Sequence, residues 1–174
     1  NPQGNTPWEF VSVEQRPVFS GKTASTRTAE GLSQHFFTDA KPLLSIGGDD
    51  TLFAYVYLDP ENPPQEIMLQ FNDGSWNHRA VWGDKNAIDW GELGTASRQY
   101  MGELPALGKW TRLDVPVAKV GLKAGSKLNG WAFTQFGGTV YWDKAGLNTI
   151  TPQAGMQFES LARWDAVQRG LKGE

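Results

Sequence analysis

The sequence contains no cysteine. That absence excludes disulfide frameworks, thiolate metal sites, covalent haem attachment and cysteine nucleophiles. It does not show whether the protein resides in an oxidising or a reducing compartment, because a chain of 174 residues can form a core without disulfides. Long apolar runs are also missing, since none approaches the roughly 18 residues of a membrane span. We therefore expect no membrane insertion.

An excess of positive charge is missing as well. The chain carries 16 Lys+Arg against 19 Asp+Glu, which gives a formal net charge of −3, and it has no dense basic run. It therefore lacks the electrostatic footprint of a protein that binds a nucleic-acid backbone or an anionic membrane. We expect neither of these partners.

Recognisable catalytic motifs are absent too. The sequence has no GxSxG, HExxH, P-loop or GxGxxG pattern. Its two histidines, His35 and His78, lie in strand-like segments, where a core or surface role is the simpler interpretation. No two carboxylates are marked as the pair of a glycosidase. These absences predict a chain that is not an enzyme.

Glycine, proline and aromatic residues are abundant. The chain has 20 Gly, 10 Pro and 8 Trp, and 39% of its residues are hydrophobic. Many turn residues and many aromatics, with enough apolar residues for a core, predict a globular all-β protein. Residues 1–7 lack the charged and apolar regions of a signal peptide, and the chain does not start with Met. We interpret it as a processed protein or a domain of a larger one, with residues 1–7 as a linker.

Alternating segments predict the strands. Residues 51–59 alternate aliphatic with aromatic side chains, which indicates a central strand with both faces covered. Residues 109–117 alternate between an apolar side and a side that carries Trp110, Arg112 and Asp114. Strand-patterned runs joined by turn residues, without alternating helices, are typical of an antiparallel sandwich.

The connections carry three further predictions. Residues 20–34 are small and polar and are expected to form a long loop. Residues 128–136 and 139–143 are aromatic-rich runs on either side of a Gly-Gly pair, which predicts a β-hairpin. Over residues 155–171 apolar side chains recur at helical spacing, which predicts an amphipathic helix.

The expected fold class is all-β: a jelly-roll-like antiparallel β-sandwich with a C-terminal amphipathic helix. The sandwich is expected over residues 8–151. Residues 152–174 then form the C-terminal helix or a linker to a next domain.

The segment from Asp73 to Tyr100 mixes tryptophans with planar polar groups and includes part of a long irregular stretch, residues 83–108. A pyranose has an apolar C–H face that stacks on an indole, while its hydroxyl groups need fixed donors and acceptors. The segment is therefore a candidate polysaccharide-binding surface. Its stacking rings would be Trp76, Trp82 and Trp90, and its hydrogen-bonding groups Arg79, Asp84, Asn86, Asp89 and Arg98. In the alternative interpretation, the tryptophans plug the ends of the sandwich, and Arg79 or Arg98 pairs with a carboxylate to fix the loop.

Two long runs of the sequence resemble a known family. They are HRAVWGDKNAIDWGELGTASRQYMGELPALGKWTRLDVPVAKVGL and LNGWAFTQFGGTVYWDKAG. The resemblance covers roughly residues 35–146 and is to a β-sandwich domain of very large exported planctomycete-type proteins that also carry cytochrome c segments. It implies a laminin-G-like or carbohydrate-binding-like module of a multidomain protein outside the cytoplasm, whether periplasmic, at the cell surface or secreted.

A structural calcium ion is a further expectation. In jelly-roll carbohydrate-binding modules an Asp on the last strand commonly meets main-chain carbonyls and an acidic residue of the first strand around calcium. Asp143, in the run YWD, would be that Asp, Glu9 its acidic partner, and residues 21–28 the source of carbonyls. The alternative is a surface Asp that pairs with Lys144 or Arg16.

Three functions compete for this sequence. A non-catalytic carbohydrate-binding module is favoured by the Trp-rich polar segment. A structural or protein-interaction module is favoured by the amphipathic tail. A small polysaccharide lyase or hydrolase ranks third, because no acid/base or nucleophile set is recognisable.

Overall fold

The computed structural model describes residues 9–16 and 18–153. The predicted linker, residues 1–7, and the predicted helix, residues 155–171, lie outside the described residues. Within them the chain is all-β, as the sequence predicts, and no helix there has the length and hydropathy needed to cross a bilayer. The elements are β1 (Glu9–Ser12), β2 (Thr23–Phe37), β3 (Leu44–Ser45), β4 (Thr51–Leu58), β5 (Glu66–Asn72), β6 (His78–Gly83), β7 (Gln99–Gly102), β8 (Trp110–Pro116), the 3₁₀ turn η1 (Val117–Val120), β9 (Lys127–Leu128) and β10 (Gly130–Asn148).

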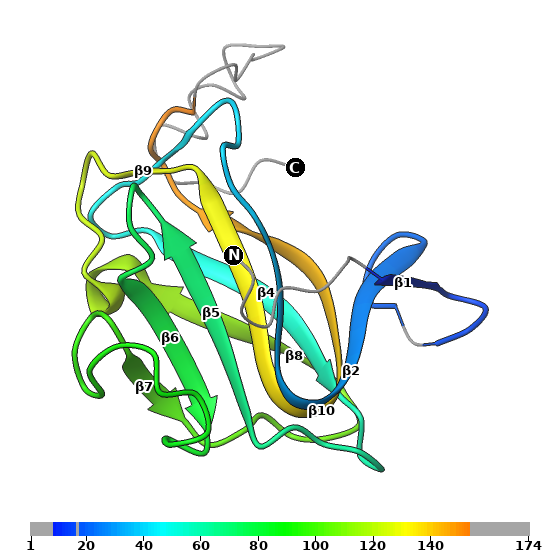
Figure 1. Ribbon diagram of the computed structural model, residues 1–174. Coiled ribbons are helices and arrows are strands. Elements are labelled where there is room, and N and C mark those ends of the chain that lie inside the picture. Colours follow the sequence, from blue (N-terminus) through cyan, green and yellow to red (C-terminus); the bar gives the residue numbers. More distant parts are fainter. Residues whose placement is uncertain (1–8, 17, 154–174) are drawn as a thin grey trace.

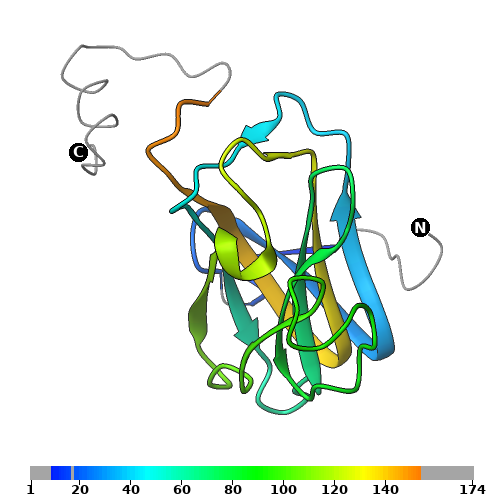
Figure 2. The same cartoon turned by 90° about the vertical axis from the view of Figure 1, so that its left-hand side faces the viewer.

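Most strands belong to one hydrogen-bonded sheet that folds over on itself into two layers (Figure 1, Figure 2). Layer one consists of β7, β6, β5, the first half of β10 and the second half of β2. Layer two consists of β8, β4, the second half of β10, the first half of β2 and β1. Every pair is antiparallel except β6 with β7, and β3 pairs with β9 in a small separate sheet. This is the predicted sandwich, with β2 and β10 running side by side through both layers.

Strand β10 serves both layers because it bends near its middle. Residues 130–136 pair with β5, and residues 140–148 pair with β4. The register of β10 against β2 shifts between Phe136 and Gly138, and the φ angles of Gly137 and Gly138 are 68° and 70°. The predicted hairpin is therefore wrong. The two halves have different partners, so the glycines bend one strand instead of reversing the chain.

Gly138 is required by space as well as by conformation. A Cβ atom at this position would overlap the backbone of Pro63 and Pro64 in the connection between β4 and β5. That connection is bonded to the bend on both sides of Gly138, because the Thr139 N–H donates to Asn62 O at 2.7 Å and the Gln65 N–H donates to Phe136 O at 2.9 Å. The bend and the connection thus fix each other.

Strand β2 occupies most of residues 20–34, which were predicted to form a loop. The loop prediction is therefore wrong. The small polar side chains of β2 bond to the backbone of β10: Ser25 Oγ donates to Trp142 O and Thr26 Oγ1 donates to Val140 O, both at 3.3 Å. The strand pairs with β10 along almost its whole length. Strand formation here depends on that long partner more than on the residues of β2 themselves.

The core lies between the two layers. Every second residue of β4 points into it and is fully buried, while the residues between them point outward and are only partly buried. Strand β4 is central, between β10 and β8, as predicted, but its outer face is only partly covered. The inward residues of β4 are Leu52, Ala54, Val56 and Leu58, and they pack with Ile67, Leu69, Phe71, Trp82, Leu113, Val115, Trp131, Phe133, Val140 and Trp142.

We expect Gly138→Ala to destabilise the protein by about 3 kcal/mol, because it combines a left-handed backbone with overpacking against the proline segment. Two control variants separate these causes in urea unfolding. Gly125 has a φ of 91° but no atom near the position of a Cβ, so Gly125→Ala should cost only about 1–2 kcal/mol. Gly31 has neither a positive φ nor a close neighbour, so Gly31→Ala should cost less. A Gly138→Ala variant no less stable than Gly125→Ala would contradict the packing argument.

Candidate functional site

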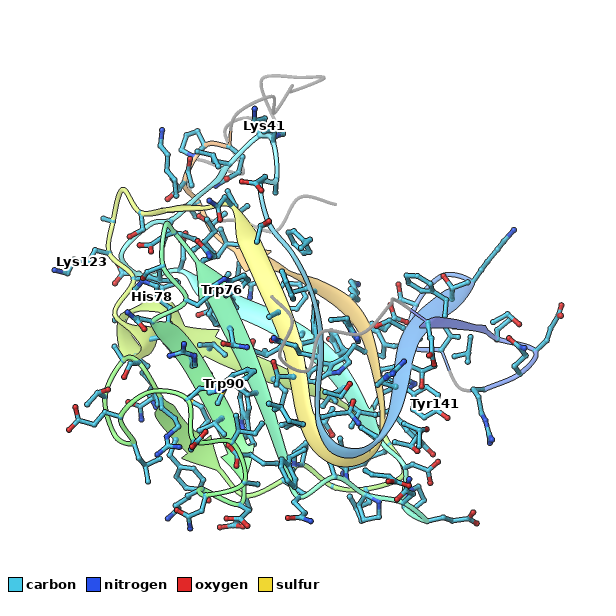
Figure 3. All side chains as sticks on the ribbon, in the orientation of Figure 1. Lys41, Trp76, His78, Trp90, Lys123 and Tyr141 are labelled. Atoms are coloured by element: carbon cyan, nitrogen blue, oxygen red, sulfur yellow. The ribbon has the colours of Figure 1, made fainter. Side chains whose placement is uncertain are left out.

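The segments predicted to form the site lie on the outer face of layer one. Trp76 comes from the connection between β5 and β6, and Trp90 from the connection between β6 and β7; Figure 3 labels both over these strands. Trp82 points the other way and is 7% exposed within the core. The reason is the alternation of β6, in which Ala80 and Trp82 face inward while Arg79 faces outward. Two of the three predicted rings therefore share a face, and Trp82 is corrected to a core residue.

A network of polar side chains crosses the centre of this face. Gln70 Nε2 donates to Gln34 Oε1 at 3.1 Å and to Thr134 Oγ1 at 2.9 Å. Arg79 Nε donates to Gln70 Oε1 at 2.9 Å. Gln34, Gln70 and Thr134 are almost fully buried, whereas Arg79 is half-buried. The network joins four neighbouring strands, and Arg79 is its member with exposed surface.

The connection between β6 and β7 is bonded firmly to layer one. The Ile88 N–H donates to Glu66 Oε2 at 2.9 Å, Arg98 Nη1 donates to Ile88 O at 2.7 Å, and Arg79 Nη1 donates to Ser97 O at 2.9 Å. Both Arg79 and Arg98 therefore fix this loop, as the alternative interpretation expected of one of them. They bind main-chain carbonyls and not a carboxylate, while the carboxylate of Glu66 binds a main-chain N–H.

The two indoles on this face are held from below and partly exposed. Trp76 packs edge-on against Phe36, with ring centroids 5.8 Å apart and an interplanar angle of 79°. Trp90 packs against a small buried cluster that includes Met68 and Ile88. Both indoles are half-buried. Each ring is thus fixed by packing and still presents surface to solvent.

Most of the predicted polar residues of the site are exposed. Asp84, Asn86 and Asp89 lie on the same connection as Trp90. Asp84 Oδ1 accepts the N–H of Asn86 at 2.9 Å, which fixes a local turn. Arg98 differs from them, because it is half-buried and bonded to the loop. We call the set Trp76, Arg79, Asp84, Asn86, Asp89 and Trp90 the tryptophan surface.

Two ionisable residues are buried on opposite sides of layer one. Burial raises the pKa of Glu66 from its ordinary 4.5 to about 7, and hydrogen bonds from backbone N–H groups oppose this shift only in part. Burial, and then the charge of Arg27, lower the pKa of His35 from 6.5 to about 4. His35 lies on the core side, where its ring centroid is 5.5 Å from that of Phe133. Both groups are enclosed by protein, so their shifts concern stability.

The predicted calcium ligands have other partners in this structure. Asp143 Oδ2 accepts the N–H groups of Phe19 and Ser20, each at 2.9 Å. Glu9 forms an ion pair with Arg27. In the described part of the chain no three His, Cys, Asp or Glu side chains lie close enough together to hold a metal ion. This arrangement does not fit a calcium ion between Asp143 and Glu9, and calcium stays a prediction.

A second group of rings, on the outer face of layer two, was not predicted. Tyr57 pairs with Trp110, Tyr55 with Arg112, and Phe53 with Asp114. The alternation of residues 109–117 contains the missed signal, because a strand side that carries Arg112 and Asp114 faces solvent and its paired neighbours on β4 must do the same. We call Phe19, Phe53, Tyr55, Tyr57, Trp110 and Tyr141 the aromatic face.

No protein-family model and no curated protein matches this chain. Solved structures with a related arrangement include the glycoside hydrolase domain of Endo-D from Streptococcus pneumoniae R6, with 11% identity and a TM-score of 0.43 over 80% of this chain and 21% of that chain. They also include TmCBM61 in complex with β-1,4-galactotriose, with 11% identity and a TM-score of 0.42 over 83% of this chain and 90% of that chain. Similarity at this level transfers no function.

The shifted pKa values of Glu66 and His35, which lie on opposite sides of layer one, predict an unusual dependence of stability on pH. Glu66 stabilises the fold in full below its unfolded pKa of 4.5 and loses this contribution as the pH rises toward 7. His35 contributes in full above 6.5 and loses its contribution as the pH falls toward 4. Between pH 4.5 and 6.5 the two slopes oppose each other.

We expect Glu66→Gln to remove one of these slopes. The amide keeps an oxygen for the Ile88 N–H but does not titrate. The stability of the variant relative to the wild type should therefore increase by about 3 kcal/mol from pH 4.5 to pH 7 in urea unfolding. A difference between the two proteins that does not change with pH would contradict this account.

Asp143 allows a test that separates loop capture from metal binding. We expect Asp143→Ala to cost about 1–2 kcal/mol, because an ionised acceptor of two N–H groups is lost. Asp114→Ala, which removes an exposed partner of Arg112, is the matched control and should cost less. Both are measured by unfolding with and without a chelator. If Asp143 only holds the loop that contains Phe19 and Ser20, Asp143→Ala should cost the same with and without the chelator. A cost that disappears with the chelator would identify Asp143 as a calcium ligand.

Proposed function

We propose that this chain is a non-catalytic carbohydrate-binding module of a larger exported protein and that it holds a polysaccharide at the tryptophan surface. The observation that carries the proposal is the pair of half-buried indoles, Trp76 and Trp90, each fixed by packing on one face of layer one. A sugar ring that stacks on an indole needs such a fixed and accessible ring. The exported setting and the neighbouring cytochrome c segments belong to the proposal through the family resemblance.

The polar groups of the tryptophan surface complement the hydroxyl groups of a sugar. Asp84, Asn86 and Asp89 offer exposed acceptors, Asn86 also offers donors, and Arg79 offers a guanidinium at the edge of the buried network. Because the connection is bonded to layer one, little ordering is needed on binding. With few contacts to a flexible chain, we expect a Kd on the order of micromolar to millimolar.

A structural or protein-interaction module is the second candidate. Tryptophan and arginine are also enriched in protein interfaces, so half-buried indoles beside Arg79 are compatible with a protein partner. A polysaccharide lyase or hydrolase is the third. Its best candidate acid, Glu66, lies beneath the connection with Oε2 bonded to Ile88, where a glycosidic oxygen has no access.

Affinity gel electrophoresis on a panel of soluble polysaccharides tests the proposal, with β-1,4-galactan as one member. We expect retention of the wild type on at least one polymer and an affinity at least about tenfold lower for Trp76→Ala, a loss of about 1.4 kcal/mol. Trp90→Ala should act in the same direction. Melting should fall far less than for Trp82→Ala, which should cost about 3–5 kcal/mol.

Leu93→Ala is the matched control, because it removes an exposed apolar side chain from the same connection without removing a ring. Its retention should equal that of the wild type. If no polymer retains the wild type, or if Trp76→Ala and Trp90→Ala bind as well as the wild type, the glycan site proposed here is wrong and the protein-interaction alternative gains.

A further inference from the structure

The aromatic face covers the outside of layer two, on the opposite side of the sandwich from the tryptophan surface. Strand pairing aligns its residues in rows across β8, β4 and β10. One row is Trp110, Tyr57 and Tyr141; the next is Arg112, Tyr55 and Asp143; the third is Asp114, Phe53 and Gly146. We propose that this face is a second binding surface and that it takes a single chain of a neutral polysaccharide. The ligand class is that of the proposed function, but the residues are different.

The rings of the aromatic face are held in place by one another. Tyr57 lies between Trp110 and Tyr141, at centroid distances of 5.8 Å and 5.7 Å. Tyr141, labelled in Figure 3, is only 4% exposed and so acts as a support, whereas Tyr57 and Trp110 are half-buried. Rings that are already ordered lose little freedom when a ligand stacks on them. The face is thus prepared for binding before a ligand arrives.

A loop extends the row of rings. Phe19, from the connection between β1 and β2, stacks on Tyr55 with centroids 3.7 Å apart and an interplanar angle of 17°. Asp143 holds it there, because its Oδ2 accepts the N–H groups of Phe19 and Ser20. The ring of Phe19 remains 38% exposed. Asp143 is therefore a positioning residue for the aromatic face.

The angles between the rings indicate what kind of polymer fits. The planes of Tyr57 and Trp110 differ by 55°, and those of Phe53 and Tyr55 differ by 84°. A flat crystalline surface needs coplanar rings. Rings at these angles instead suit successive sugar units of one chain, whose planes can turn relative to one another.

The charges around the rings favour a neutral ligand. Arg112 Nε lies 2.8 Å from Asp114 Oδ1, and its guanidinium stacks over Phe53 at 4.1 Å from the ring centroid. Glu9 is paired with Arg27 at the opposite border. Asp143 accepts two backbone N–H groups, and Lys144 Nζ lies 5.9 Å from the centroid of the Phe19 ring. Because these positive and negative groups balance, the face has no excess of one sign with which to attract an anionic polymer or an anionic lipid surface.

The segregation of side chains on β4 favours a sugar over a protein. All four aliphatic residues of the strand point into the core, and three of its four outward, half-buried positions carry rings, the fourth being Thr51. Protein interfaces are enriched in tyrosine and tryptophan as well, but they also gain from burying leucine or isoleucine, so a protein partner does not require that aliphatic side chains be absent from the face. Stacking against the C–H face of a sugar requires rings.

The test compares a ring with an aliphatic side chain of similar burial at one position. Tyr57→Phe keeps the ring, whereas Tyr57→Leu keeps apolar area and removes the ring. On soluble neutral polysaccharides (mixed-linkage β-glucan, xylan, galactan and mannan) we expect Tyr57→Phe to bind within about twofold of the wild type. Tyr57→Leu and Trp110→Leu should bind at least about tenfold more weakly, a loss of about 1.4 kcal/mol. Crystalline cellulose should retain the wild type poorly.

The same measurements distinguish this surface from the tryptophan surface. Loss of binding only in the Tyr57→Leu and Trp110→Leu variants supports the aromatic face and overturns the site at Trp76. Loss only in Trp76→Ala and Trp90→Ala overturns the aromatic face alone, and absence of wild-type binding overturns both. Melting curves confirm that each variant is folded. Self-association of the wild type in sedimentation that Tyr57→Leu retains as fully as Tyr57→Phe would identify a second copy of the chain as the occupant and overturn the inference.

Discussion

The whole structure depends on one constraint, which is that β10 has to be a central strand in both layers. A pleated strand that turns from one layer into the other leaves carbonyl groups without ladder partners at the turn. Here the buried side chain of Gln135 supplies donors, because its Nε2 donates to Gly137 O at 3.0 Å and to Gly138 O at 2.8 Å. The two halves of β10 then face each other across the core, with Phe133 and Trp142 at a centroid distance of 5.3 Å.

The two outer faces follow from the same geometry. Because side chains alternate across a strand, the residues between the core positions of β4 and β6 must point away from the core, on opposite sides of the molecule. Layer one covers much of its outer face with the connection between β6 and β7, held by Glu66, Arg79 and Arg98. Among the described residues, layer two leaves more of its outer face open, with Phe19 and Arg112 lying over Tyr55 and Phe53. The two faces therefore differ in cover because of the connections that cross them and not because of the strands.

Alternation in the sequence predicted the strands well where it was regular, as in residues 51–59 and 109–117. It failed for β2, whose small polar residues form a strand because a long partner lies beside them, and that partner is remote in sequence. The Gly-Gly pair was misinterpreted for a related reason, since positive φ angles allow a bend as readily as a reversal and only the pairing of the flanking residues decides. Of the proposed site, the position of Trp90 beside polar residues was predictable from the sequence. Alternation with Ala80 also indicated a core position for Trp82, but Trp82 was predicted as a surface ring because it lies next to the irregular stretch that begins at residue 83.

The place of β10 in the chain also determines the order of events during synthesis. This strand ends at Asn148, and it completes layer one with β5 and layer two with β4. Every other described strand therefore leaves the ribosome before the one that joins them. Until then each layer is an incomplete sheet with an uncovered apolar side, and contacts between such distant segments form slowly. Until β10 emerges, a nascent chain of this domain exposes these incomplete layers to proteases and to aggregation, however stable the finished domain is.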